Sequence, residues 1–149
     1  MQGRQLGLFT QSSDSGQQPH RPVQLLLVED DDDTRDLMAL ALRGAGFAVQ
    51  PAGSGREALA LLEATPYDLL VTDYDMPGMT GTEMLQIATE RGLVRTARPL
   101  IVTAHPSPKG TEGFPVVRKP LDLARFVAML RSFHAGGPDA NSSGDKQAN

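Results

Sequence analysis

The chain has 149 residues, of which 40% are hydrophobic and 21% are charged, values typical of one ordinary globular domain. Its net charge of −4 argues against sequence-independent binding to nucleic acid, because that binding needs cations that neutralise phosphates. The chain has no cysteine, which excludes disulfides and thiolate metal sites and fits a reducing compartment. No apolar run approaches the ~20 residues needed to span a bilayer. We therefore expect a soluble, cytoplasmic protein that binds neither nucleic acid nor membrane.

Between two polar ends, the chain alternates short apolar runs with stretches of helical hydrophobic spacing. Residues 1–22 and 135–149 are rich in Gln, Ser, Gly and Asn and are expected to be a disordered leader and tail. The intervening domain, 23–134, has apolar runs that predict strands over 23–28, 47–51, 69–73, 99–104 and 116–117. Helical spacing predicts helices over 34–43, 55–64, 80–91 and 121–134. This alternation predicts an α/β fold of the flavodoxin-like, doubly wound type, a five-stranded parallel sheet of order 2-1-3-4-5.

Local signals refine this outline at two places. Pro51 indicates that the second strand lies near an edge of the sheet, because proline cannot donate a ladder hydrogen bond. The segment 105–113 contains two prolines and two glycines, so the helix between the fourth and fifth strands is expected to be shortened or absent.

The first helix follows an acidic run, residues 29–33. We expect Asp32 to be its N-cap. Its apolar residues are Leu37, Met38, Ala41 and Leu42. Five consecutive acids repel one another, and a bound cation would relieve that repulsion.

Four of the predicted strands end in polar side chains, namely Glu29 and Asp30, Asp73, Thr103 and Lys119. An aspartate after a strand is by itself as typical of a turn as of a ligand site. Parallel strands, however, bring their carboxyl ends to one edge of the sheet, where open α/β sheets bind ligands. The convergence of these side chains therefore favours a functional site.

The chemistry of this edge is that of phosphoryl transfer. Carboxylate oxygens without His or Cys favour Mg²⁺, which Asp30 and Asp73 could hold while leaving positions for water and a phosphoryl oxygen. Thr103 can donate a hydrogen bond to a second phosphoryl oxygen, and Lys119 can pair with a third. Asp73 is the candidate nucleophile.

The motifs Val28-Glu29-Asp30, Asp73-Tyr74-Asp75-Met76-Pro77-Gly78, Val102-Thr103-Ala104 and Lys119-Pro120 follow one another in this order. Over 23–134 the chain closely resembles the bacterial response-regulator receiver domain. The resemblance implies a domain that is not an enzyme in the ordinary sense, since it catalyses only its own phosphorylation and dephosphorylation. It implies that Asp73 accepts a phosphoryl group from a histidine kinase or phosphotransfer protein in a Mg²⁺-dependent reaction.

The resemblance also implies roles for the acidic residues. Asp30 would ligate Mg²⁺ directly together with Asp73, Glu29 would act through water, and Asp75 would offer its backbone carbonyl. Because the acidic run is long, Asp31 is an alternative to Asp30.

The switch residues follow the family pattern in part. Thr103 matches the switch hydroxyl, and the Lys119–Pro120 bond matches one that is usually cis. The family usually has an aromatic residue three positions before the lysine, where this chain has Val116. Phe114 is the candidate substitute, since in a strand it would share a face with Val116.

Three other classes are less consistent with the sequence. A haloacid-dehalogenase-like phosphatase would share Asp73-Tyr74-Asp75 but has Thr or Val at the position of Pro77 and needs a later acidic pair. A glycosyltransferase would need a sugar-nucleotide domain that the length does not accommodate. A non-phosphorylated pseudo-receiver would lack a site residue, and none is missing, but the switch region departs from the family pattern and leaves this alternative open. With no further domain after the last helix, we expect a stand-alone receiver that acts by protein contact or onward phosphotransfer.

Overall fold

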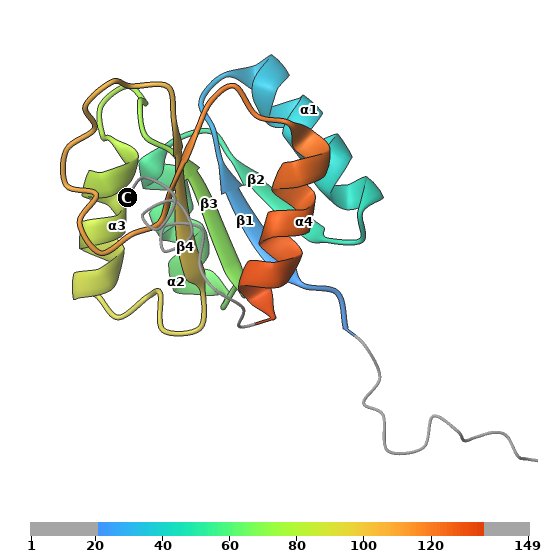
Figure 1. Cartoon of the computed structure of the whole chain (residues 1–149). Coiled ribbons are helices and arrows are strands. Elements are labelled where there is room, and N and C mark those ends of the chain that lie inside the picture. Colours follow the sequence, from blue (N-terminus) through green and yellow to red (C-terminus); the bar gives the residue numbers. More distant parts are fainter. Residues whose placement is uncertain (1–20, 136–149) are drawn as a thin grey trace, which may run out of the picture.

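A computed structural model describes residues 21–135, in which strands and helices alternate (Figure 1). The strands are β1 (Gln24–Val28), β2 (Ala48–Ala52), β3 (Leu69–Asp73), β4 (Arg98–Thr103) and β5 (Val116–Arg118). The helices are α1 (Asp32–Gly44), α2 (Gly55–Ala64), α3 (Gly81–Glu90) and α4 (Leu123–His134). Each of these elements begins and ends within two residues of its expected bounds. All but one residue of the expected tail and all but two residues of the expected leader lie outside the described residues.

The five strands form one parallel sheet of order β2-β1-β3-β4-β5, which confirms the predicted flavodoxin-like topology. Pro51 lies in β2, at an edge of the sheet as expected. The edge position suits proline, which has no N–H to offer a further strand.

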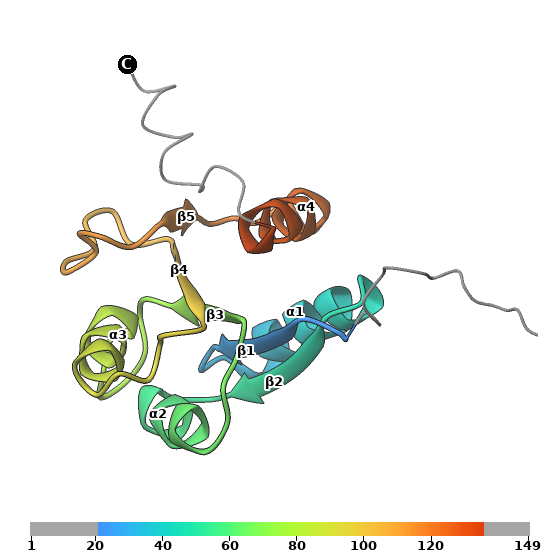
Figure 2. The ribbon, with the colours of Figure 1, turned by 90° about the horizontal axis from the view of Figure 1, so that it is seen from below.

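Helices cover both faces of the sheet, with α1 and α4 on one face and α2 and α3 on the other (Figure 2). Alternate residues of the interior strand β1 pack on the two faces. Leu25 and Leu27 pack with α1 and α4, whereas Leu26 and Val28 pack with α2 and α3. Burial on both faces explains why β1, β3 and β4 appear in the sequence as continuous apolar runs.

The buried face of α1 leaves out Leu37, one of the apolar residues of the predicted helix. The structure buries Met38, Ala39 and Leu42, but leaves Leu37 57% exposed and Leu40 70% exposed. The buried stripe follows the i, i+4 pair Met38 and Leu42, and Leu37 lies a helical step of about 100° outside it. The apolar residues of the predicted helix therefore do not all belong to its buried face.

In the described chain, β4 and β5 are joined by residues 104–115 without an intervening helix, as expected. We call this segment the 104–115 loop. Gly110 and Gly113 adopt positive φ angles of 75° and 89°, which glycine tolerates best. Among the helices of residues 21–135, none combines the length and hydropathy required of a membrane span.

Candidate metal and phosphoacceptor site

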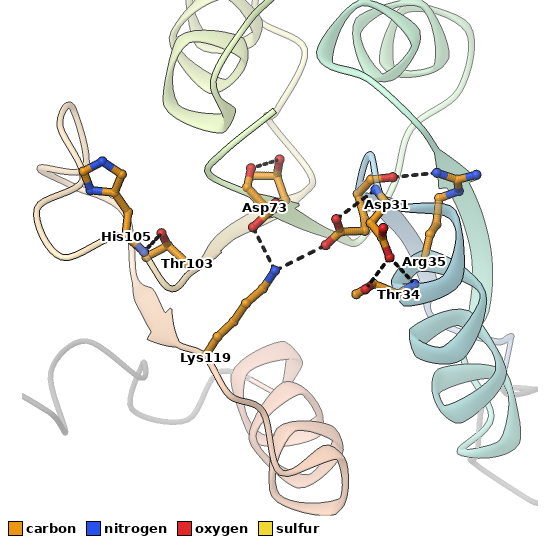
Figure 3. A network of polar contacts seen from close by, with 9 residues as sticks. Asp31, Thr34, Arg35, Asp73, Thr103, His105 and Lys119 are labelled. Carbon is orange, nitrogen blue, oxygen red and sulfur yellow. Dashed lines mark hydrogen bonds and ion pairs between the residues drawn. The ribbon is translucent and has the colours of Figure 1, made fainter. Parts of the chain in front are cut away.

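The carboxyl ends of the strands bring the predicted site residues together (Figure 3). Asp73 is the last residue of β3 and is 8% exposed, and Thr103 is the last residue of β4 and is fully buried. Glu29 directly follows β1, and Lys119 directly follows β5. The backbone N–H of Lys119 donates to the Thr103 carbonyl at 2.9 Å, which fixes the two positions relative to each other.

A single ammonium group bridges two buried carboxylates. Lys119 Nζ lies 3.2 Å from Asp73 Oδ1 and 3.5 Å from Glu29 Oε1. The carboxylate side chains are almost completely buried, whereas the lysine is partly exposed. One positive charge therefore faces two negative charges at an edge of the sheet where solvent is largely excluded.

The pKa shifts reflect this imbalance. Burial raises the pKa of Asp73 and of Glu29. The attraction of Lys119 offsets only part of this effect, and at Glu29 the hydrogen bond from the Asp31 N–H opposes it more strongly. For Lys119, burial alone would lower the pKa, but the two carboxylates together raise it above the usual lysine value. Both carboxylates would be stabilised in their charged form by an additional cation.

The acidic residues are arranged for such a cation. One carboxylate oxygen from each of Glu29, Asp30 and Asp73 can be chosen so that the three oxygens lie within 4.8 Å of one another. Hard oxygen donors without nitrogen or sulfur suit Mg²⁺, which commonly uses one or two carboxylates and completes its shell with water and phosphate oxygens. The residues present therefore fit the expected ion.

Asp31, the alternative metal ligand, caps helix α1. Its Oδ2 accepts hydrogen bonds from the backbone N–H of Thr34 at 2.8 Å and from the Thr34 hydroxyl at 2.7 Å, so that it is the N-cap of α1. The expectation that Asp32 is the cap was wrong. Because α1 begins at Asp32, the residue before it has the capping geometry. Asp32 instead pairs with Arg35 at 2.6 Å.

The β3–α3 connection contains Asp75 and leads into α3. Asp75 is exposed two residues after Asp73, and its role as a carbonyl ligand stays a prediction. Helix α3 begins with a complete capping box formed by Thr80 and Glu83. The N–H of Gly81 donates to the Tyr74 carbonyl at 2.8 Å, which holds the start of α3 against the end of β3.

The hydroxyl of Thr103 accepts a hydrogen bond from the backbone N–H of His105 at 2.8 Å. An accepting hydroxyl keeps its own proton to donate. Phe114 and Val116, the expected switch positions, are both half-buried against the same core cluster, although Phe114 precedes β5 rather than lying in it. Their role in switching stays a prediction.

Two residues near the site had no signal in the sequence. Arg35 donates from Nη1 to the Glu29 carbonyl at 2.8 Å and so supports the acidic segment. Tyr74 is buried next to Asp73, and its hydroxyl accepts from the backbone N–H of Lys109 at 3.0 Å. The Tyr74 contact joins residues 35 positions apart, which no sequence spacing reveals, whereas Arg35 contacts a residue only six positions away.

The sequence profile of the response regulator receiver domain matches residues 25–131, and the chain belongs to this family. Sensory transduction protein RegX3 of Mycolicibacterium smegmatis is 30% identical to it over 128 residues. That alignment covers 80% of this chain and 54% of RegX3, so the chain spans about half the length of that relative.

Solved structures show the same fold. The chemotaxis response regulator CheY4 of Vibrio cholerae superposes with a TM-score of 0.67 and 26% identity, covering 74% of this chain and 98% of CheY4. The response regulator TrrA of Thermotoga maritima, solved in complex with Mg²⁺ and BeF, has a TM-score of 0.66 and 24% identity. This match covers 74% of the chain and 97% of TrrA, and at this identity it shows the likeness of the fold alone.

Proposed function

We propose that this protein is a response regulator that accepts a phosphoryl group on Asp73 from a histidine kinase or phosphotransfer protein in the cytoplasm. The observation that carries the proposal is the position of Asp73 between a cation and two further acids. Its carboxylate lies 3.2 Å from Lys119 Nζ and belongs to the three-carboxylate cluster with Glu29 and Asp30.

Asp30 and Asp73 would hold Mg²⁺ directly, with Glu29 close enough to act through water. When bound, the ion supplies positive charge to the phosphoryl oxygens as negative charge develops on them. Asp30 is favoured over Asp31 for this role because the Asp31 carboxylate is engaged in capping α1.

In the transfer step, a carboxylate oxygen of Asp73 attacks phosphorus. The new O–P bond forms as the P–N bond to the donor histidine breaks, and the released imidazole keeps the electron pair and takes up a proton. Lys119 can then move its ion pair from the carboxylate to a phosphoryl oxygen. Thr103 turns its hydroxyl to donate to another phosphoryl oxygen, so the product is bound by side chains at the strand ends.

Phosphorylation of Asp73 can be tested with Mg²⁺ and a small phosphodonor such as acetyl phosphate. Intact mass should show one added phosphoryl group on the wild type and none on Asp73→Asn. Asp68→Asn is the matched control. Asp68 directly precedes the amino end of the same strand, where it pairs with Arg21 and not with Lys119. Modification that persists in Asp73→Asn would contradict the assignment. A wild type that binds Mg²⁺ and stays unmodified would favour the pseudo-receiver.

We propose that the phosphorylated domain acts in one of two ways, by binding a partner protein or by passing the phosphoryl group on. A phosphorylation-dependent binding protein would keep its phosphoryl group long enough to change its affinity for a partner. A phosphate relay would pass the group rapidly to a phosphotransfer histidine. Adding a purified phosphotransfer protein to the phosphorylated chain and following loss of label separates the two modes.

A further inference from the structure

The 104–115 loop is fastened to the body of the domain from two sides. On the β3–α3 side, the Tyr74 hydroxyl accepts from the N–H of Lys109 at 3.0 Å, and the Thr82 hydroxyl donates to the Lys109 carbonyl at 2.9 Å. On the β5 side, the guanidinium of Arg118 donates to the carbonyl of His105. A segment without a helix is thus held by specific bonds to its backbone.

Tyr74 is the fastening residue closest to the phosphoacceptor. It directly follows Asp73 in the chain, it is 8% exposed, and its own N–H donates to the Val102 carbonyl at 3.0 Å. Its ring meets that of His105 edge to face, with the ring centres 5.3 Å apart and an interplanar angle of 67°. Tyr74 therefore contacts the loop at two points, Lys109 and His105.

Thr103 also forms a hydrogen bond with His105 of the loop. Its hydroxyl oxygen accepts from the N–H of His105 at 2.8 Å (Figure 3). Under the proposed function this hydroxyl donates to a phosphoryl oxygen on Asp73. Turning toward that oxygen would carry the Thr103 hydroxyl away from the His105 N–H. His105 would then lose this hydrogen bond and keep only its ring contact with Tyr74 among these two contacts.

We propose that Tyr74 acts as the aromatic coupling residue of this receiver, and that it holds the 104–115 loop closed until phosphorylation of Asp73 releases it. The inference rests on the proposed function and adds to it the residue and the segment that change state. It gives this chain, which has valine at position 116, an aromatic residue that directly follows Asp73 and contacts the loop at His105. Coupling of this kind is reciprocal, so loosening the loop must strengthen binding of a phosphoryl group.

The test uses Tyr74→Phe, which keeps the ring and its packing and removes only the hydroxyl that Lys109 needs. The probe is beryllofluoride with Mg²⁺, titrated by NMR against the full chain. We expect binding about two- to tenfold tighter than in wild type, the equivalent of one neutral hydrogen bond lost from the closed state. The ligand-free variant should also exchange the Lys109 amide proton faster. Tyr67→Phe, the same change at the chain's other tyrosine before β3, should alter neither quantity.

In wild type, beryllofluoride should speed exchange at the amides of Lys109 and His105. If Tyr74→Phe binds the probe no more tightly than wild type, the coupling is wrong while the Asp73 site stands. Slower loop exchange on adding the probe to wild type would overturn the coupling in the same way. A folded wild type that does not bind beryllofluoride in Mg²⁺ would remove the proposed function, and the coupling with it.

Discussion

Replacing Gly81 by alanine tests how closely α3 must approach the end of β3. A Cβ at this position would lie 2.2 Å from the Asp73 carbonyl oxygen and 3.1 Å from Thr72 Oγ1, whereas ordinary contact begins at 3.4 Å. The nearest atom belongs to backbone, so no flexible side chain can move aside. Helix and strand must separate by roughly an ångström, and overpacking of this kind costs about 1–3 kcal/mol. Because both partners are held by hydrogen bonds, we expect the upper end of that range.

Denaturant unfolding of Gly81→Ala, monitored by circular dichroism, measures this loss of stability. The matched control is Gly44→Ala at the end of α1, where the added Cβ meets no heavy atom within 4 Å. The control should be neutral or stabilising by up to about 1 kcal/mol, because alanine is the better helix former. The displacement should also move Asp73, and misplacement by 1 Å can slow a reaction by about 10²-fold. An unfolding free energy of Gly81→Ala within about 0.5 kcal/mol of wild type would refute the reasoning.

Three further predictions concern charge, burial and the metal. Burial alone would raise the pKa of Asp68, but hydrogen bonds from Arg21 and the Gln24 amide, together with nearby positive charge, lower it. The stabilising effect of Asp68 therefore exists above the unfolded pKa and is lost as pH falls through the lower folded value. Asp68→Ala should cost about 2 kcal/mol at pH 7, and the difference from wild type should shrink in acid unfolding curves. Leu42→Ala should cost about 2–5 kcal/mol in denaturant unfolding, whereas Leu40→Gln should stay within about 0.5 kcal/mol. Mg²⁺ should raise the melting temperature of wild type in calorimetry but not that of Asp30→Asn, and equal shifts in both would count against the cluster.

The fold could be predicted because its strands are buried on both faces. Such strands are continuous apolar runs, and the runs at 23–28, 69–73 and 99–104 stand out against their flanks. The site followed from topology rather than from spacing. Asp73 and Lys119 are 46 residues apart, but once the strands are parallel their ends must meet at one edge.

Some details could not be predicted because neighbouring residues of the same type have the same sequence preferences. In a run of five acids, several residues could cap the helix. Asp31 rather than Asp32 is the cap because the helix begins at Asp32. On α1, apolar residues nearly surround the helix, so their pattern does not reveal that Leu37 and Leu40 face outward. The position of Tyr74 depends on the path of the 104–115 loop, which long-range contacts determine.

The short pairing of β5 has a consequence for local unfolding. β5 pairs with β4 at three positions, whereas β3 and β4 pair at five, so β5 and the start of α4 should be among the first parts to open in native-state hydrogen exchange. Lys119 lies on this less stable unit, whereas Glu29 and Asp30 follow the interior strand β1 and Asp73 ends the central strand β3. A brief opening would withdraw the ammonium group and leave the three carboxylates in place. Mg²⁺ binding should therefore tolerate fluctuations that interrupt the hold on a phosphoryl group.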